Sequence, residues 1–432
     1  QGSYSIGCVT MDPNNSNVIW VGTGENNNQR SVAYGDGVYK SEDGGKSWNH
    51  VGLKNSEHIG KIIVHPSNSD VVYVAAIGPL WSKGGDRGLY KTEDGGETWT
   101  SLIEVDEHTG VNDVVMDPRN PDVLYASTFQ RRRHVYTYVG GGPGSGMHKS
   151  VDGGATWTKI DKGLPGEELG RIGLAISPAN PEIIYAIVEA ANGKGGFFAS
   201  TNRGASWEKR SSHVTSGNYY QEIIADPVDE HTVYSMDTWM SVTHDGGKTF
   251  DLVGEDTKHV DNHCMWINPE NNQHWVVGCD GGIYETFDAA KTWDFKKNLP
   301  VTQFYKVAVD NDYPFYNIYG GTQDNFSLGG PSRVLTNHGI RNSEWFITNG
   351  GDGFESQVDP NNPNIVYAQS QYGFLVRFDK RSGEAVGIQP KPRRGENEYN
   401  FNWDAPLVVS RHAPGRLYFS AEKVFRSNDY GN

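Results

Sequence analysis

A short motif of the form Ser/Thr-x-Asp-x-Gly-x-x-Trp/Phe recurs along the 432 residues of the chain, and this repeat constrains the fold more than any other feature. The copies read SEDGGKSW (41–48), TEDGGETW (92–99), SVDGGATW (150–157), STNRGASW (200–207), THDGGKTF (243–250) and TFDAAKTW (286–293). Their acidic or amide residues are Asp43, Asp94, Asp152, Asn202, Asp245 and Asp288, and Asp429 begins a further copy. The first six copies are 43 to 58 residues apart, and Asp429 follows Asp288 by 141, which is three periods of 47. This spacing indicates repeated supersecondary units, two of which have lost the motif.

A second element accompanies each unit and also marks the two units that lack the motif. It consists of a strand, a turn of Pro and Asn, and a strand rich in Val, Ile and Tyr, as in MDPNNSNVIWVG (11–22) and VHPSNSDVVYVA (64–75). An aromatic strand, the Asp motif and a fourth short strand complete the unit. Four antiparallel strands at this period are typical of propeller blades. We therefore predict an all-β fold, a β-propeller of four-stranded antiparallel blades, with eight complete blades and part of a ninth.

The Asp motif falls in the predicted tight turn between the third and fourth strands of each blade. A carboxylate in such a turn can accept hydrogen bonds from backbone N–H groups, and Gly supplies backbone angles that a Cβ atom forbids. The Trp lies on the fourth strand and can pack into the blade. We therefore interpret the repeated Asp as a structural turn residue rather than as a repeated active site.

These motifs resemble Asp boxes, and essentially the whole chain is similar to the Asp-box (BNR) β-propellers. That family includes sialidases, sortilin-type ectodomains and xyloglucanase-type glycoside hydrolases, and its Asp boxes are structural turns away from the active site. The chain is closest to bacterial proteins described as sortilin-like or as BNR-repeat glycosyl hydrolases. It lacks the Arg-Ile-Pro signature of a sialidase. The resemblance implies a fold rather than one function, because propellers support many activities.

The repeat also gives an expectation about the extent of the chain. The sequence ends at SNDYGN, where the repeat requires two more positions. We therefore expect residues 1–432 to form a single β-propeller that is a fragment of a longer protein, incomplete at both ends.

Composition narrows the partners. The chain has 53 acidic and 38 basic residues and a net charge of −15, which disfavours a nucleic-acid partner. No stretch approaches the roughly 18 apolar residues of a membrane span. Cys264 and Cys279 flank NPENNQ (268–273), and a hairpin there is expected to place them face to face. Two interpretations are open: the two cysteines form a disulfide, or they are two small buried residues that are not bridged.

The irregular segments are expected to gather on one face of the propeller. Loops between the second and third strands, such as 24–37 and 129–146, share that face with the links between blades. The Pro/Asn turns and the Asp motifs occupy the opposite face. Sites are usually built on loops that a rigid scaffold carries, so we place the functional site on the irregular face, centred on the fifth to eighth blades.

Several carboxylates on this face are candidates for catalysis. A glycoside hydrolase needs two carboxyl groups about 5–9.5 Å apart. The candidates are Asp261, Asp324 and Asp352, and Asp280 and Asp404 lie on the same rim.

His259, Asp261 and His263 alternate in HVDNH, so on an extended strand they point the same way and could hold a divalent metal. A cluster of satisfied hydrogen bonds is the other interpretation of that segment, and no other cofactor is indicated.

Two functions remain open from the sequence. The favoured one is an extracytoplasmic propeller that binds a peptide, a protein or a glycan on its irregular face. The alternative is a glycoside hydrolase that uses a pair of rim aspartates. The predicted ligand-binding residues are Arg131, Arg132, Arg133, Tyr219, Tyr220, Phe304, Tyr305, Gln323, Asn325 and Trp403. Aromatic rings can stack on sugars or apolar side chains, and the arginines either grip an anion or cap acidic neighbours.

Overall fold

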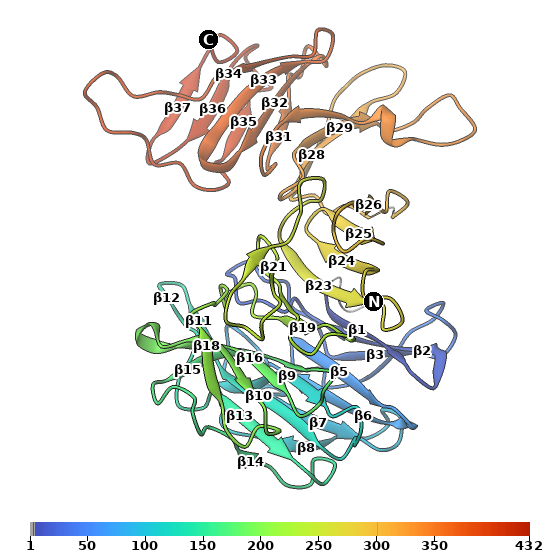
Figure 1. Ribbon diagram of the computed structural model, residues 1–432. Coiled ribbons are helices and arrows are strands. Elements are labelled where there is room, and N and C mark those ends of the chain that lie inside the picture. The colour runs from blue at the N-terminus through green and yellow to red at the C-terminus, as the bar shows by residue number, and fades with distance from the viewer. Residues whose placement is uncertain (1–2, 4, 300) are drawn as a thin grey trace. The chain divides into compact units, whose positions relative to one another are not determined.

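The computed structural model describes residues 3, 5–299 and 301–432, and it divides into two compact units. Unit 1 is Gln1–Lys296 and unit 2 is Lys297–Asn432. Both consist almost entirely of short antiparallel sheets (Figure 1). The predicted all-β fold of four-stranded blades is confirmed. That residues 1–432 form one propeller stays a prediction.

Six four-stranded sheets make up unit 1. The first two contain β1 (Ile6–Asp12), β2 (Asn15–Thr23), β3 (Val38–Ser41), β4 (Asn49–Gly52), β5 (Ile59–His65), β6 (Asn68–Ala76), β7 (Gly88–Thr92) and β8 (Thr100–Ile103). The third contains β9 (Thr109–Met116), β10 (Leu124–Gln130), β13 (Gly146–Ser150) and β14 (Thr158–Lys159), with the hairpin β11 (Arg132–His134) and β12 (Thr137–Val139) inserted after β10. The fourth contains β15 (Leu169–Ile176), β16 (Ile184–Ala190), β17 (Gly196–Ser200) and β18 (Glu208–Ser211), with the short 3₁₀ helix η1 (Ala191–Gly193) before β17. The last two contain β19 (Ile223–Ala225), β20 (Val233–Ser235), β21 (Ser241–Thr243), β22 (Asp251–Leu252), β23 (Asn262–Ile267), β24 (Trp275–Cys279), β25 (Gly282–Thr286) and β26 (Asp294–Phe295).

Unit 2 contains two four-stranded sheets and one three-stranded sheet. The first is formed by β27 (Lys306–Val309), β28 (Asn317–Gly321), β29 (Ser327–Pro331) and β30 (Phe346–Asn349). The second is formed by β31 (Ser356–Val358), β32 (Ile365–Ser370), β33 (Phe374–Asp379) and β34 (Glu384–Gly387). The third is formed by β35 (Leu407–Val409), β36 (Leu417–Ser420) and β37 (Val424–Ser427). Two 3₁₀ helices, η2 (Asn342–Glu344) and η3 (Gln371–Gly373), lie in its loops.

Apart from the inserted hairpin, each sheet pairs its strands in chain order. The turn between the first and second strands therefore lies at the same end of the sheet as the Asp motif between the third and fourth. We call this end of each unit the turn face. The loop between the second and third strands and the link to the next sheet lie at the opposite end, which we call the loop face. The predicted separation of regular turns from irregular loops is confirmed within each unit.

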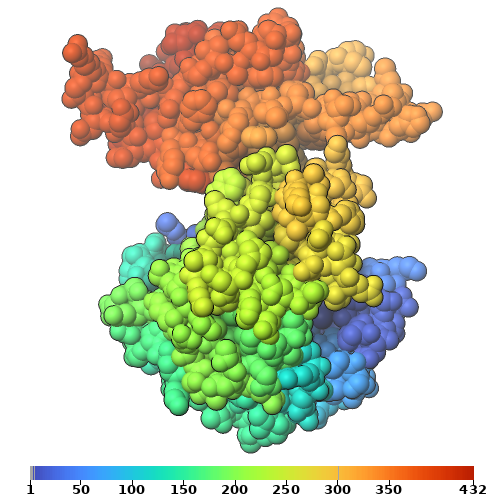
Figure 2. Space-filling model, viewed as in Figure 1, coloured from blue at the N-terminus to red at the C-terminus, as the bar shows by residue number. Residues whose placement is uncertain are grey.

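The cores of unit 1 lie between neighbouring sheets. One cluster joins Trp20 and Val38 of the first sheet to Ile59 and Val74 of the second. Equivalent clusters join the second to the third sheet, the third to the fourth, the fourth to the fifth and the fifth to the sixth. Because sheets that are adjacent in the sequence pack together, the colours in Figure 2 change gradually over the surface of each unit. Each sheet thus supplies one wall to each core it borders.

The Asp motifs adopt one hydrogen-bonded turn. In the third copy, the Asp152 carboxylate accepts hydrogen bonds from the Thr156 N–H (2.9 Å) and from the hydroxyls of Ser150 (2.8 Å) and Thr156 (2.5 Å). The hydroxyl of Thr156, followed by its backbone N–H, lowers the pKa of Asp152 to about 2. Asn202 keeps the turn by accepting from the Ser206 N–H and donating to the Ser206 hydroxyl. These local bonds support the interpretation of the motif as a structural turn.

This geometry predicts how the turn responds to substitution and to acid. Asp152→Ala removes the accepted bonds and should lower the melting temperature at pH 7, whereas Asp152→Asn should lower it less, because Asn202 fills the same position. The lowered pKa means that the stabilisation by Asp152 is present above the ordinary pKa near 4 and is lost as the pH falls toward 2. Melting temperatures measured from pH 7 to pH 2 should therefore show a smaller acid-induced decrease in both variants than in the parent. An alanine variant as stable as the parent at pH 7 would contradict the structural role.

The cysteines do not form the cross-strand pair that their spacing suggested. Cys264 pairs with Gly278 in the regular part of the ladder, and Cys279 pairs with Asn262 beyond an irregularity, so the two cysteines are out of register with each other. A shift of one residue turns a side chain to the other face of a sheet. Cys8, Cys264 and Cys279 are free thiols.

Candidate functional site

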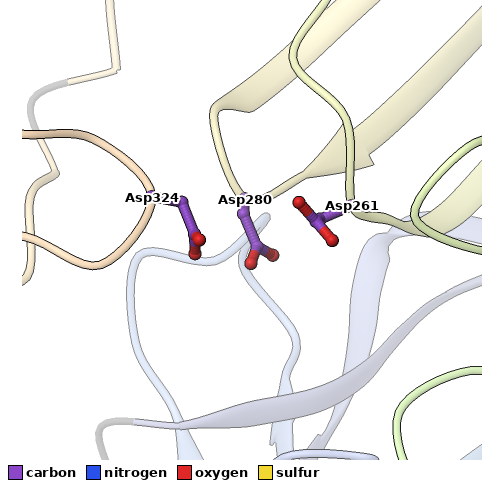
Figure 3. A group of neighbouring side chains, drawn as sticks. All are labelled: Asp261, Asp280 and Asp324. Atoms are coloured by element: carbon purple, nitrogen blue, oxygen red, sulfur yellow. The ribbon is translucent and has the colours of Figure 1, made fainter. Parts of the chain in front are cut away.

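The loop face of unit 1 carries two aspartates with different partners (Figure 3). Asp261 lies in the link before β23, and Asp280 lies in the turn between β24 and β25. One carboxylate oxygen of each lies within 4.8 Å of the other. The Tyr220 hydroxyl donates to Asp261 Oδ1 (2.7 Å), and His263 Nε2 is hydrogen-bonded to Asp280 Oδ1 (2.7 Å). The third residue drawn in Figure 3, Asp324, belongs to unit 2 and is described there.

The aromatic partners of these carboxylates are coupled to each other. The Tyr220 ring stacks on the His263 imidazole, with ring centroids 5.4 Å apart and an interplanar angle of 25°. Burial lowers the pKa of His263, but the hydrogen bond and charge of Asp280 outweigh burial, so that the pKa is raised above its ordinary value. Burial raises the pKa of Tyr220, so its hydroxyl stays protonated and donates to Asp261. The two carboxylates therefore have unlike surroundings, one beside a neutral hydroxyl and one beside a basic imidazole.

A buried ion pair fixes the segment that holds Asp261. Lys258 Nζ lies 2.7 Å from Glu255 Oε1, and both side chains are fully buried. The Asn262 amide donates to Glu255 Oε1 (2.9 Å) and to Asp237 O (3.2 Å). The Asp261 N–H donates to Thr238 O (2.8 Å). A buried charge pair with this many hydrogen bonds holds its segment in one conformation, because losing any partner leaves a buried charge unpaired.

The proposed metal ligands His259, Asp261 and His263 do not converge among the described residues. The prediction assumed an extended strand, but Asp261 has a positive φ of 62°, and β23 begins only at Asn262. The alternation of side chains is therefore broken at Asp261. His263 is turned toward Asp280, and Nδ1 of His259 is hydrogen-bonded to Val260 O (2.9 Å).

A row of aromatic rings runs across the loop face of unit 2. Tyr305 stacks on Phe354 (5.2 Å), Phe354 meets the edge of Trp403 (6.2 Å), and Trp403 meets Tyr372 at 88° (5.0 Å). Phe354 is buried, while Trp403 is 45% exposed and Tyr372 is 62% exposed. Tyr372 has a positive φ of 57°, a conformation uncommon for a residue with a side chain, and Asn192 has the same conformation in the equivalent turn of unit 1. We call these four residues the aromatic row.

The row adjoins a shallow cavity of about 380 Å³. Its lining includes Tyr372, Pro390, Lys391, Tyr399 and Phe401. The Gln389 amide donates to Tyr372 O (3.0 Å), which ties the wall of the cavity to the row. Aromatic and proline surfaces with a few polar groups are the usual lining of a ligand site.

The carboxylates of unit 2 differ in their exposure. Asp352 is buried, and its Oδ1 accepts the backbone N–H of Asp324 (3.1 Å). It therefore shapes the turn between β28 and β29, where Asp324 itself has a positive φ of 60°. Asp404 forms an ion pair with Lys306 (2.9 Å). Asp352 thus holds the backbone of Asp324, and a catalytic role for either residue stays a prediction.

The other predicted ligand residues are dispersed. Arg131 is only 1% exposed and donates to Gly78 O (2.7 Å) and to Asn28 Oδ1 (2.5 Å), so it holds loops together and is not carried into the proposed ligand site. Arg132 and Arg133 lie on β11, and Tyr219 packs against Tyr220 (5.9 Å). In unit 2, Gln323 is bonded to the Tyr305 hydroxyl, Asn325 lies in the same turn, and Phe304 stacks on Trp345 (6.3 Å).

Sequence reasoning missed Tyr372 and the buried pair Glu255–Lys258. Tyr372 could have been noticed as an aromatic residue before a glycine in a short loop between a second and a third strand. No sequence pattern indicated the ion pair Glu255–Lys258, because its burial depends on packing between the fifth and sixth sheets.

Comparison with known proteins agrees with the predicted resemblance. Residues 36–141 match the family model for Sortilin-Vps10, described as sortilin, neurotensin receptor 3. Xyloglucanase Xgh74A of Acetivibrio thermocellus is 25% identical over 392 residues, which cover 86% of this chain and 37% of that protein. A xyloglucanase of Hypocrea jecorina is 27% identical over 274 residues, covering 60% of this chain and 28% of that protein. The chain thus resembles sortilin-like and glycosyl hydrolase-like Asp-box propellers.

One solved structure supports the fold itself. PorZ, an essential bacterial surface component of the type-IX secretion system of Porphyromonas gingivalis, is 12% identical and has a TM-score of 0.51. The match covers 98% of this chain and 52% of PorZ. Among the described residues, none of the helices has the length and apolar character needed to cross a membrane.

Proposed function

We propose that this chain is part of an extracytoplasmic glycoside hydrolase that acts on a xyloglucan-like glycan. The observation that carries the proposal is the carboxylate pair Asp261 and Asp280, whose partners differ and whose nearest oxygens approach within 4.8 Å, slightly below the about 5–5.5 Å between the carboxyl groups of a retaining glycoside hydrolase. The sequence similarity to xyloglucanases supports the substrate class. The chain spans 37% of the length of the first of those relatives, so further parts of the protein can contribute to its activity.

Glycoside hydrolysis gives unlike tasks to two carboxyl groups. One donates a proton to the leaving oxygen, and the other attacks the sugar or activates water in its ionised form. A protonated His263 stabilises negative charge on Asp280, which suits the ionised role. Asp261, beside the neutral Tyr220 hydroxyl, is left for the proton donor. Unlike surroundings of two neighbouring carboxyls are the usual basis for such a division.

The aromatic row favours a second candidate, in which the chain binds a glycan without cleaving it. Rings of the size of Tyr and Trp stack on the apolar faces of sugars, and the row offers three exposed rings, of which Tyr372 lines the cavity. This candidate needs no catalytic carboxylate. Product release separates the two: the hydrolase liberates new reducing ends from xyloglucan, and the binding module does not.

Trp403→Ala tests the role of the aromatic row. The affinity for xyloglucan oligosaccharides, measured by isothermal titration calorimetry, should fall about 5- to 10-fold, because one stacking surface is lost. Tyr313→Ala is the matched control, since Tyr313 is an exposed aromatic in unit 2 outside the row. Equal affinities of the two variants would remove the row from the proposed site. Titration of the parent alone shows whether the glycan binds at all.

A further inference from the structure

The hairpin β11–β12 on the loop face of unit 1 brings together arginines that form no ion pair among the described residues. Arg131 precedes it, Arg132 and Arg133 lie on its first strand, and Arg87 is near enough to Arg132 for their charges to interact. The arginines that form ion pairs in the described part of the chain are others: Arg119, Arg171, Arg203, Arg210 and Arg381. A group of four arginines outside ion pairs stands out in a chain whose net charge is −15.

Two of these arginines are fixed inside the protein. Arg87 donates to Ile77 O (3.0 Å) and to Ser82 O (2.8 Å), and Arg131 donates to Gly78 O (2.7 Å). Burial lowers the pKa of Arg131 to about 9, and the charge of Arg87 adds to that effect. Burial, aided by both arginines, lowers the pKa of His58 to about 3, so that ring stays neutral. Glu57 is the acidic group that offsets both arginines, and burial raises its own pKa.

Arg132 has unused hydrogen-bonding capacity and, unlike Arg131, whose Nε also has no partner, it is not fully buried. Its side chain is half-buried, and its enclosed Nη1 has no hydrogen-bond partner. Arg133 is held beside it, with Nε donating to Asn28 O (2.7 Å) and the guanidinium over the Tyr138 ring (4.7 Å). An enclosed guanidinium nitrogen without a partner is costly, and native proteins rarely keep one unless a ligand or ion completes it.

We propose that Arg132, supported by Arg133, binds the carboxylate of an acidic sugar, so that the glycan received by unit 1 carries a uronic acid residue. This inference rests on the proposed function, because it names the class of glycan that the loop face receives. A guanidinium matches a carboxylate with two parallel hydrogen bonds, and the charges of Arg87 and Arg131 add attraction because these two arginines outnumber Glu57, the carboxylate that acts on both.

The tip of the hairpin supplies a surface for the sugar ring. Tyr136 is 86% exposed and stacks on the His134 imidazole at an angle of 11°, with ring centroids 5.5 Å apart. An exposed ring that is already held flat loses little conformational freedom when a ligand packs on it. A uronic acid has a charged carboxylate and a ring with an apolar face. The arginines match the carboxylate, and the Tyr136 ring matches the apolar face.

Calorimetric titration with two oligosaccharides of equal length, one carrying a glucuronate and one neutral, tests the inference. The parent should bind the acidic ligand about tenfold more tightly at low salt, and Arg132→Gln should reduce that advantage to about twofold. Arg132→Lys keeps the positive charge but loses the planar guanidinium that donates two parallel hydrogen bonds. Its preference for the acidic ligand should therefore be intermediate. Arg203→Gln is the control, because Arg203 is paired with Asp117 (3.5 Å) on the turn face, and it should keep the full advantage.

Other outcomes separate this inference from the proposed function. Equal affinity of the parent for the two ligands overturns the acidic-sugar site, and hydrolysis of the neutral ligand would still support the hydrolase. A preference for the acidic ligand with no cleavage of either supports the site and removes the hydrolase. If inorganic sulfate competes for the site as strongly as glucuronate does, the site does not select a carboxylate and that assignment is overturned. Melting temperatures of the variants show that each is folded before it is titrated.

Discussion

Asp280→Asn is expected to lower the rate of xyloglucan hydrolysis by about 10²- to 10⁴-fold, with little change in affinity for the glycan. The substitution keeps the size of the side chain and its capacity to bond to His263, but it removes the charge that a nucleophile or base requires. Asp261→Asn should have an effect of similar size, because the reaction needs both carboxyl groups. The measurement is the turnover number from released reducing ends, together with the dissociation constant from calorimetry.

The control is another exposed aspartate of unit 1. Asp251 lies on β22, and Asp251→Asn should leave the turnover number unchanged. If Asp280→Asn retains more than about half of the parent activity, the pair is not the catalytic one and the proposed mechanism is wrong. If the parent itself releases no product while binding xyloglucan, the binding function replaces the hydrolase.

Trp20→Ala is expected to destabilise unit 1 by about 3–5 kcal/mol. Trp20 is fully buried in the core between the first two sheets, where its ring meets Trp99 edge-on (6.4 Å) and lies 5.2 Å from Lys40 Nζ. Removing the indole leaves a cavity that the two sheets can close only in part. Urea unfolding followed by circular dichroism measures the change.

Trp239→Ala supplies the comparison, since Trp239 is 52% exposed and belongs to none of the cores. That substitution should change the free energy of unfolding by no more than about 0.5 kcal/mol. Similar losses for the two variants would mean that the cores between sheets do not dominate the stability of unit 1.

The fold could be predicted because the repeated residues act locally. The hydrogen bonds of Asp152 stay within its own turn, so sequence spacing alone reveals both the turn and the strands that flank it. Strand order followed from the same pattern, and with it the assignment of each loop to a face. The sequence did not reveal that Arg131 is buried, because its partner Asn28 lies 103 residues away.

The candidate site could be predicted only in part, for a related reason. Asp261 and Trp403 were identified from their loops, but the neighbours that define their chemistry come from other loops. The bond from Tyr220 to Asp261 spans 41 residues. The alternation assumed for the predicted metal ligands is interrupted, because Asp261 has a positive φ and β23 begins only at Asn262. Local propensity does not report such an angle, which the buried contacts of Asn262 and Lys258 impose.

The cores between neighbouring sheets affect how a chain of this kind can evolve. The inner sheets of unit 1 each contribute to two cores, and the first and sixth sheets each contribute to one. A segment that encodes one sheet can therefore be duplicated or lost as a whole, provided that the new neighbours present matching surfaces. Loop residues outside these cores, such as the exposed Tyr136, are free of that requirement, so recognition can diversify there while the architecture is inherited unchanged.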